Sequence, residues 1–299
     1  MKILLTGKNG QVGWELNRSL LPLGQVIALD RQAADFSQPE SLRNLIRETK
    51  PDVIVNAAAY TAVDRAEDEE ELAIAVNAKS PGVLAEEAKR LDALLVHYST
   101  DYVFDGAIQG AYVEQDAPSP LNVYGRSKLT GEQAIQASGC DYLIFRTSWV
   151  YAARGKNFLL TVFNLAKERE KLSIVGDQFG SPTWAGLIAG ATSHCVRQAY
   201  VERKNRDFES GLFHLASSGY TTWHGFAEGI VKCAREQFDG QAWIKKIDSI
   251  PTSDYPTLAK RPKNSRLNSQ LLEKRFRLHM PNWEYSLSLC MEDLSEFRK

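Results

Sequence analysis

The stretch Lys2-Ile3-Leu4-Leu5-Thr6-Gly7-Lys8-Asn9-Gly10-Gln11-Val12-Gly13 decides the fold. It begins with an apolar run of strand length and continues into a Gly-x-x-Gly-x-x-Gly loop that opens a helix. In such a strand-loop-helix unit, one glycine permits the tight turn, another lets the backbone approach a pyrophosphate, and the third lets the helix pack against the strand. The helix N-terminus then faces the anion. We therefore expect Gly7, Asn9, Gly10 and Gly13 to line a dinucleotide cofactor.

The first half of the chain alternates buried strands with helices. Near-continuous apolar runs predict strands at Ile3–Thr6, Val26–Asp30, Asp52–Ala58, Leu94–Thr100 and Tyr142–Thr147. A helix is expected from about residue 69 to 91, with a kink or break at Ser80-Pro81-Gly82. This alternation predicts a doubly wound parallel Rossmann sheet over residues 1–150, of α/β class.

The second half, residues 151–299, is less regular and predicts a smaller, mainly substrate-binding lobe, with some segments returning to the main sheet. Helices are expected at Asn157–Glu168 and Trp184–Val196, and a strand at Leu172–Val175. One further helix start is predicted in the first half, where Ser37-Gln38-Pro39-Glu40 has the pattern of a capping box.

Composition excludes several classes of protein. The 299 residues carry 36 Lys and Arg against 37 Asp and Glu, so we expect no nucleic-acid partner. The basic run Arg203-Lys204-Asn205-Arg206 is interpreted as a solvated loop. Four cysteines without a CxxC pair predict free thiols in a reducing compartment rather than a disulfide framework. No apolar stretch has membrane-spanning length, and we expect a cytoplasmic protein.

The residues after the second predicted strand bear on the choice of cofactor. Asp30 ends that strand, and a carboxylate there accepts hydrogen bonds from an adenosine ribose, which favours NADH. Arg31 follows it and is able to pair with the 2′-phosphate of NADPH. We expect both cofactors to be used without strong discrimination. Asp35-Phe36 lies where an adenine would be contacted, and the small residues of Asn56-Ala57-Ala58-Ala59-Tyr60-Thr61 leave space for a ligand at the sheet edge.

Tyr124 and Lys128 are the candidate acid/base pair. Their spacing places both side chains on one helix face, where an ammonium would lower the pKa of the phenol towards working pH. The phenol could then give a proton to a carbonyl oxygen as hydride arrives. Thr100 ends a predicted strand upstream and would orient the same oxygen. Tyr200 and Lys204 repeat the spacing without such a partner, so we interpret them as a decoy.

Several longer stretches resemble one group of enzymes. The glycine loop, Asn56-Ala57-Ala58, Thr100 and the Tyr124/Lys128 pair are similar in order and spacing to the extended short-chain dehydrogenase/reductases, which act largely on nucleotide sugars. KILLTGKNGQVGWEL, VNAAAYTAVDRAE, STDYVFDG, YGRSKLTGE, RTSWVY, VGDQFGSPTWA and RPKNSRL resemble the dTDP-4-dehydrorhamnose reductase family within that group, over nearly the whole chain.

The resemblance implies reduction of the C4 ketone of dTDP-4-dehydro-L-rhamnose to dTDP-L-rhamnose with NADPH or NADH. It implies Thr100, Tyr124 and Lys128 as the catalytic triad. The cofactor residues it implies are Gly10, Gln11, Val12, Asp30, Asp35, Phe36, Ala59, Tyr60, Thr61 and Tyr98. Those near the sugar are Asp101, Phe104 and Trp149, with Gln178, Thr183, Arg261 and Asn264 as further nucleotide-sugar contacts in the second lobe.

Two alternatives stay open, a nucleotide-sugar epimerase and a catalytically silent NAD(P)-binding regulatory subunit. Dehydratases of this fold are similar in having Thr-Asp-Glu where this chain has Thr100-Asp101-Tyr102, so a base for elimination is missing here. The resemblance also implies a magnesium-assisted homodimer. Glu292, Asp293 and Glu296 form an acidic cluster near the C-terminus that would suit a hard cation, although a solvated helix face is the favoured interpretation.

Overall fold

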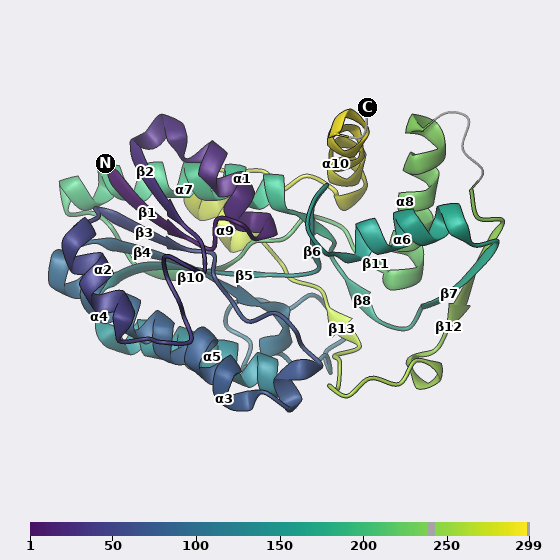
Figure 1. Cartoon of the computed structure of the whole chain (residues 1–299), viewed down its shortest axis with the longest axis horizontal. Helices are drawn as coiled ribbons and strands as arrows, with labels where there is room; N and C mark the ends of the chain where they lie inside the picture. The colour runs from purple at the N-terminus through teal and green to yellow at the C-terminus, as the bar shows by residue number, and fades with distance from the viewer. Residues whose placement is uncertain (239–242, 298–299) are drawn as a thin grey trace.

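A six-stranded parallel sheet forms the centre of the computed structural model, which describes residues 1–238 and 243–297 (Figure 1). The strand order is β10-β5-β4-β3-β1-β2, and every neighbouring pair is parallel. The strands are β1 (Lys2–Thr6), β2 (Gln25–Leu29), β3 (Val53–Asn56), β4 (Leu94–Thr100), β5 (Asp141–Thr147) and β10 (Gly211–His214). The predicted doubly wound parallel sheet is confirmed, and β10 from the second half adds its outermost strand next to β5.

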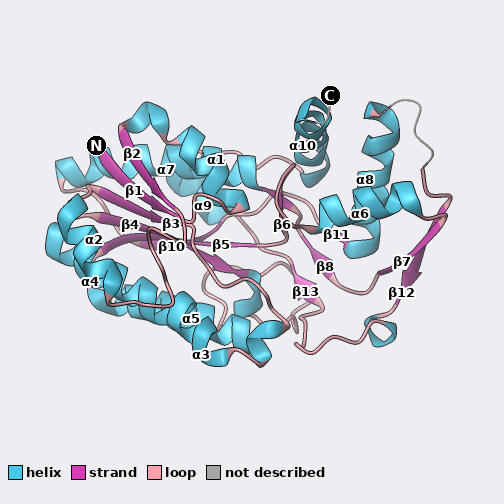
Figure 2. Cartoon of the chain, viewed as in Figure 1, coloured by secondary structure: helices cyan, strands magenta, loops and turns pink. Residues whose placement is uncertain are grey.

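Helices cover both faces of this sheet (Figure 2). One face carries α1 (Gln11–Ser19), α7 (Ala185–Asn205) and α9 (Gln270–Phe276), and the other carries α2 (Ser41–Thr49), α4 (Ser80–Leu91) and α5 (Val123–Ser138). Alternation along β1 explains both layers, because successive side chains of a strand point to opposite faces. Ile3 and Leu5 are buried with α1 and α7, whereas Leu4 is buried with α2 and α4.

The helix expected from residue 69 to 91 is divided by a widened turn. It comprises α3 (Glu70–Ile74), a π-helical turn at Ala75–Lys79, and α4, which has Pro81 in its first turn. Proline has no backbone N–H to donate, so it is accepted at the start of a helix and not within one. The predicted break is therefore present as a π-helical turn directly before Ser80.

A second lobe packs beside the carboxyl ends of the strands (Figure 1). Its helices are α6 (Phe158–Glu168), α8 (Trp223–Gln237) and α10 (Trp283–Phe297), and they share a separate hydrophobic core with the parallel pair β7 (Lys171–Val175) and β12 (Lys246–Ile250). The remaining strands are β6 (Val150–Tyr151), β8 (Phe179–Gly180), β9 (Thr183–Trp184), β11 (Thr221–Thr222) and β13 (Asn264–Ser265). Within the described ranges, no helix is both long and apolar enough to cross a membrane.

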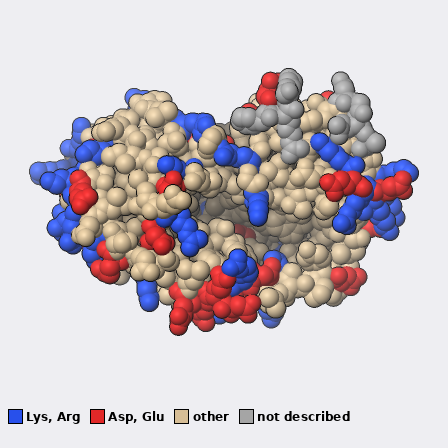
Figure 3. Space-filling view, viewed as in Figure 1, with Lys and Arg blue, Asp and Glu red and all other residues tan. Residues whose placement is uncertain are grey.

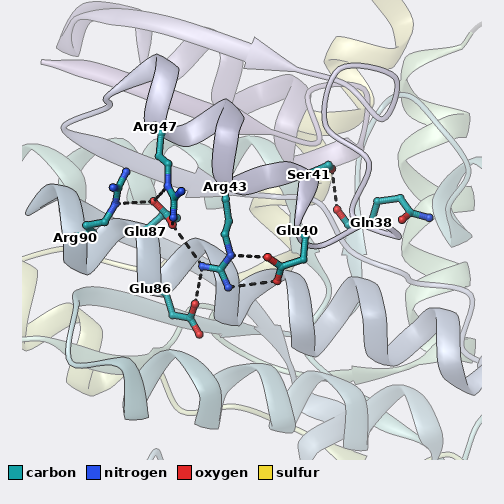
Figure 4. Close-up of polar contacts among 8 residues, drawn as sticks. All are labelled: Gln38, Glu40, Ser41, Arg43, Arg47, Glu86, Glu87 and Arg90. Carbon is teal, nitrogen blue, oxygen red and sulfur yellow. Dashed lines mark hydrogen bonds and ion pairs between the residues drawn. The ribbon is translucent and has the colours of Figure 1, made fainter.

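The predicted capping box at Ser37–Glu40 is wrong. The Ser37 hydroxyl donates to the carboxylate of Asp35 (2.8 Å), and α2 starts only at Ser41. Glu40 pairs with Arg43 in the first turn of α2 instead of reaching back (Figure 4). The Ser37 hydroxyl is therefore bonded to Asp35 and does not cap a helix.

Figure 4 also shows how α2 is fastened to α4. The carboxylate of Glu87, which is 2% exposed, accepts hydrogen bonds from Arg43, Arg47 and Arg90. These bonds hold the pKa of Glu87 below its usual value, with Arg47 as the largest cause. A nearly buried carboxylate is tolerated here because three guanidinium groups satisfy its oxygens.

The basic run at 203–206 is not a loop. It forms the end of α7, which continues to Asn205, nine residues beyond the predicted end at Val196. Arg203 bonds to Asp92 (2.8 Å) and Asp141 (2.6 Å), and cations are favoured at a helix C-terminus by the helix dipole. These interactions explain why a strongly charged segment is helical.

Candidate active site

A cleft of about 360 Å³ lies at the carboxyl ends of β1, β2 and β3. The chain leaves β1 for β2 on one side and later for β3 on the other, so this is the topological switch point where doubly wound sheets bind ligands. The surface is visibly hollowed where the two lobes meet (Figure 3). The cleft brings together ten of the predicted cofactor residues: Gly7, Asn9, Gly10, Asp30, Arg31, Asp35, Phe36, Ala58, Ala59 and Tyr60.

Two glycines of the loop permit contacts that no other residue would. Gly7 has φ +75°, and a Cβ there would lie 2.7 Å from the backbone of Ala57. A Cβ on Gly13 would lie 2.0 Å from the Gly7 carbonyl oxygen, so α1 can pack against the turn only because Gly13 has no side chain. Gly10 is the N-cap of α1 and provides no side-chain cap, which leaves N–H groups at this helix end for an anion. The loop therefore fits the pyrophosphate of a dinucleotide.

The rim of the cleft carries opposite charges. The Asp30 carboxylate accepts the backbone N–H groups of Ala33 and Gln32, and Lys8 Nζ lies 3.3 Å from it. These hydrogen bonds, that of Ala33 first, lower the pKa of Asp30 and keep it ionised. Lys8 was not predicted, although its position inside the glycine loop was a clue. With Arg31 on the same rim, the cleft offers a carboxylate for ribose hydroxyls and cations for a phosphate.

Seven predicted cofactor residues do not line this cleft: Gln11, Val12, Gly13, Thr61, Tyr98, Tyr124 and Lys128. The side-chain oxygen of Gln11 accepts a hydrogen bond from Asn157 (2.8 Å) of the second lobe. The Tyr98 ring is buried in the core, where its hydroxyl bonds to Thr192 (2.7 Å). The assignment of the Tyr98 side chain to the cofactor is therefore wrong, and only the Tyr98 carbonyl faces the site, where it accepts from Lys128.

The predicted triad lies at the end of β4 and the start of α5. Asn122 caps α5 by accepting the N–H of Gly125 (2.8 Å). A Cβ on Gly125 would lie 2.2 Å from the Tyr102 carbonyl oxygen, so glycine allows the helix to press against the turn that follows β4. This approach brings Tyr124 next to Thr100, whose hydroxyl is hydrogen-bonded to the phenol. Lys128 follows one helical turn later and is 2% exposed.

Burial sets the proton affinities of the pair. It raises the pKa of Tyr124 to about 12, opposed by the hydrogen bond with Thr100. It lowers the pKa of Lys128 to about 8, opposed by Glu132. The expectation that Lys128 lowers the phenol pKa is not met here, because the ammonium donates to the Tyr98 carbonyl (2.6 Å) instead. With or without this rise the phenol is protonated at neutral pH, as a proton donor must be.

Asp101 completes the polar group at the end of β4. Its carboxylate accepts the Thr100 hydroxyl (3.0 Å), while the Thr100 oxygen accepts the backbone N–H of Tyr102 (3.1 Å). The same hydroxyl is hydrogen-bonded to the phenol of Tyr124, and this bond lowers the phenol pKa. Burial raises the pKa of Asp101 to about 6.

An aromatic pair flanks the site in the second lobe. Trp149 has φ +47° and stacks on Trp223, with ring centroids 3.6 Å apart. A Cβ on Gly180 would lie 2.3 Å from the Trp149 ring, so the indole is confined on its edge as well. Trp223, which the sequence did not single out, donates from its indole to the side-chain oxygen of Gln178 (3.2 Å). Trp149 and Gln178, predicted separately, are thus connected through Trp223.

Other predicted substrate residues have structural partners. Phe104 is buried and stacks on Tyr112 at 4.0 Å between centroids, and its place near the sugar stays a prediction. Thr183 is fully buried, and the Asn264 amide donates to two backbone carbonyls. Arg261 pairs with Asp64 (2.8 Å) and so links the second lobe to the loop after β3.

Tyr200 is far from this site in the topology. Its neighbours include Asp52, Asp92 and Asp141, which precede or begin β3, β4 and β5, so it lies at the amino edge of the sheet. Lys204 lies over its ring, 4.6 Å from the centroid. The interpretation of this pair as a decoy agrees with its position, since ligands bind at the opposite, carboxyl edge.

A row of buried polar side chains connects the triad to the sheet. Thr6, Asn56 and His97 are register partners on β1, β3 and β4. Thr6 donates to Asn56 Oδ1 (2.8 Å), Asn56 Nδ2 lies 3.0 Å from His97 Nδ1, and Lys128 Nζ lies 3.3 Å from His97 Nε2. No role was predicted for His97, although a histidine within a buried apolar strand needs polar partners.

The acidic cluster near the C-terminus does not by itself form a metal site. Glu292 and Asp293 are exposed on α10, and the pKa of Asp293 is raised by partial burial and by Glu292. Over residues 1–238 and 243–297, no three or more His, Cys, Asp or Glu side chains come together as ligands would. The residues of one chain therefore do not fit the magnesium ion that the resemblance implies.

Comparisons with known proteins match nearly the whole chain to proteins of one family. The family model described as RmlD substrate binding domain matches residues 1–296. The dTDP-4-dehydrorhamnose reductase of Burkholderia thailandensis is 53% identical over 98% of this chain and 99% of its own length, and that of Escherichia coli K12 is 47% identical over 98% of each. The crystal structure of the Bacillus anthracis enzyme of that name, in complex with NADP, has a TM-score of 0.87, 32% identity, and coverage of 98% and 99%. This chain belongs to the dTDP-4-dehydrorhamnose reductase family.

Proposed function

We propose that this chain reduces the C4 ketone of dTDP-4-dehydro-L-rhamnose to dTDP-L-rhamnose, with NADPH or NADH as the reductant. The observation that carries the proposal is the grouping of Thr100, Tyr124 and Asp101 at the carboxyl end of β4. This grouping lies at the same edge of the sheet as the glycine-lined cleft. Membership of the reductase family and the NADP bound to the Bacillus anthracis relative support it.

The chain's own residues would act on the carbonyl oxygen. The bound nicotinamide would supply the hydride. Tyr124, whose phenol is protonated at neutral pH, would donate its proton to the oxygen as the C4 carbon is reduced. Thr100 holds the phenol in place through their hydrogen bond, and Lys128 would bind the cofactor ribose from the same helix face. Substrate contacts are proposed for Asp101 and Trp149.

The same residues favour reduction over elimination. A dehydratase needs a second carboxylate after the aspartate, and this chain has Tyr102 there. The Tyr102 ring packs edge-on against Tyr124, at 5.6 Å between centroids. It offers no base, because burial raises its pKa above the normal tyrosine value. A substrate held here would therefore gain hydride and proton without losing water.

The test uses the purified full chain with NADPH and dTDP-4-dehydrorhamnose. We expect oxidation of NADPH and formation of dTDP-rhamnose, identified by NMR. NADPH that binds but is never oxidised would support a silent regulatory subunit, and interconversion of C4 epimers without net oxidation would support an epimerase. The matched variants are Tyr124→Phe, expected to lose activity, and Tyr200→Phe, expected to retain it because that hydroxyl lies at the amino edge of the sheet.

We further propose a homodimer that acts in the cytoplasm. The family resemblance supports the dimer, and the four unpaired cysteines suit a reducing compartment. Sedimentation with and without a chelator tests both the dimer and its implied dependence on magnesium. A monomer in both conditions would contradict the dimer, and a dimer in both would contradict the metal.

A further inference from the structure

In the buried row of polar side chains that ends at Lys128, the donor and the acceptor of each hydrogen bond can be assigned. Thr6, Asn56 and His97 are adjacent on three strands, and their side chains share the face that α5 covers. Two residues earlier on each of these strands, and on the same face, lie the fully buried apolar residues Leu4, Ile54 and Leu95. A polar row inside an otherwise apolar layer is costly unless each donor meets an acceptor. The protonation state of each member can therefore be deduced from its partners.

The hydrogen bonds of Asn56 determine which groups of the row donate and which accept. Its Oδ1 accepts the backbone N–H of Ala58 (3.1 Å) as well as the Thr6 hydroxyl (2.8 Å). A backbone N–H can only donate, so the oxygen of the amide must face Ala58 and the NH₂ group must face His97. If the Asn56 amide were flipped, its NH₂ group would face the backbone N–H of Ala58 in a buried site, and neither group could accept. Asn56 Nδ2 therefore donates to His97 Nδ1, which lies 3.0 Å away.

This bond determines the histidine tautomer. His97 is 1% exposed, and burial together with Lys128 lowers its pKa well below the usual value, so the ring is neutral. A neutral ring carries one proton, and Nδ1 is an acceptor, so the proton is on Nε2. Nε2 faces Lys128 Nζ at 3.3 Å. An ammonium group has no lone pair to accept that proton, whereas a neutral amine has one.

We propose that His97, held by Asn56 in its Nε2-protonated form, is a positioning residue that presents a hydrogen-bond donor to Lys128 and so favours the neutral amine of that lysine. His97 would keep Lys128 able to gain or lose a proton near neutral pH. The ammonium form of Lys128 would then return a proton to the tyrosinate left when Tyr124 has given up its own, and would become the neutral amine that His97 favours. This inference rests on the proposed function, since it assigns a role within the same catalytic group.

The other groups around Lys128 are consistent with this role. On its own helix it is followed one turn later by Glu132, and Tyr124 precedes it by one turn. Glu132 raises the pKa of Lys128, but its carboxylate is bonded by Arg146 of β5, so its charge is largely compensated. From β4 come His97 and the Tyr98 carbonyl, which takes one proton of the lysine. The carbonyl accepts from either form of Lys128, so among these hydrogen-bonding partners only His97 adds to the effect of burial in disfavouring the ammonium.

The first experiment observes the tautomer directly. Full-length protein labelled with ¹⁵N-histidine is examined by NMR correlations between the ring nitrogens and ring protons. We expect His97 to be neutral with its proton on Nε2 from about pH 5 to pH 9, in contrast to an ordinary histidine. A proton on Nδ1, or an imidazolium within that range, overturns the proposal. No variant and no turnover are needed.

The second experiment measures the lysine. His97→Gln can turn a carbonyl oxygen towards Lys128, so the pKa of Lys128, followed by NMR of the labelled lysine side chain, should rise by about one unit. Thr6→Val is the matched control: it removes a hydroxyl from the same row but leaves Ala58 to orient Asn56, so no rise is expected. An equal pKa in both variants and the parent contradicts the proposal.

The two experiments separate the inference from the function. If the proposed function also holds, the alkaline limb of kcat/KM for keto-sugar reduction should move upward in His97→Gln by the same amount as the lysine pKa. A purely structural role of His97 would lower kcat without moving that limb. A chain that shows the predicted tautomer and lysine pKa but does not reduce the keto-sugar would refute the proposed function alone.

Discussion

The buried ion pair between Glu132 and Arg146 should be the interaction on which the placement of α5 depends most. Glu132 lies on α5 one turn beyond Lys128, and Arg146 lies on β5. The two are 1% and 3% exposed, and their two hydrogen bonds measure 2.9 and 2.6 Å. In Glu132→Gln the amide oxygen can accept only one guanidinium N–H well, and its NH₂ group opposes the other. Removing one partner of a buried pair costs about 3–5 kcal/mol because the remaining charge is unpaired.

We expect Glu132→Gln to lie near the lower end of that range, at about 3 kcal/mol, since one acceptor is kept. Urea unfolding of the full chain, followed by tryptophan fluorescence and circular dichroism, measures the change in free energy of unfolding. Glu170→Gln is the matched control: its partner is Lys245, both side chains are mostly exposed, and solvent screens the pair. If Glu132→Gln unfolds at the same urea concentration as Glu170→Gln, the reasoning is refuted.

Three further predictions concern the cofactor and the pH profile. Gly13→Ala should weaken NADPH binding at least tenfold, measured by calorimetry, because the new Cβ would lie 2.0 Å from the Gly7 carbonyl oxygen; unchanged affinity would contradict the role of the loop. Reduction should decline as the pH rises through about 8, where Lys128 loses its proton, and a pH-rate profile that stays flat across that value would count against it. The ratio of kcat/KM for NADPH and NADH should stay within about a hundredfold, since Asp30 and Arg31 share the rim; a larger preference for either would show that one of them dominates.

The backbone of the fold was predictable because the information is local. The strand beginning at Leu94 ends at Thr100 as expected, since a continuous apolar run followed by polar residues marks a strand buried on both faces. The glycine loop was predictable because few other residues tolerate its turn and close approaches. The Tyr124/Lys128 spacing placed both residues on α5 for the same kind of reason, a fixed helical repeat.

What could not be predicted depends on contacts between distant segments. Tyr98 and Phe104 have the composition of ligand contacts, but the packing of α7 and of Tyr112 buries them. Trp223 is 74 residues from Trp149 in sequence, and only folding stacks the two rings. The role of His97 depends on a hydrogen bond from Asn56, which requires the β3–β4 register. The π-helical turn before Ser80 likewise has no simple local pattern.

The most direct test of the central claim is a single-turnover measurement with Tyr124→Phe. The enzyme, saturated with NADPH, is mixed with dTDP-4-dehydrorhamnose, and the rate of NADPH oxidation is compared with that of the parent chain. If Tyr124 donates the proton, the rate should fall by about a hundredfold or more while the Kd for NADPH is unchanged. A rate within a few-fold of the parent would show that another group protonates the carbonyl oxygen, and the account of the site would be wrong.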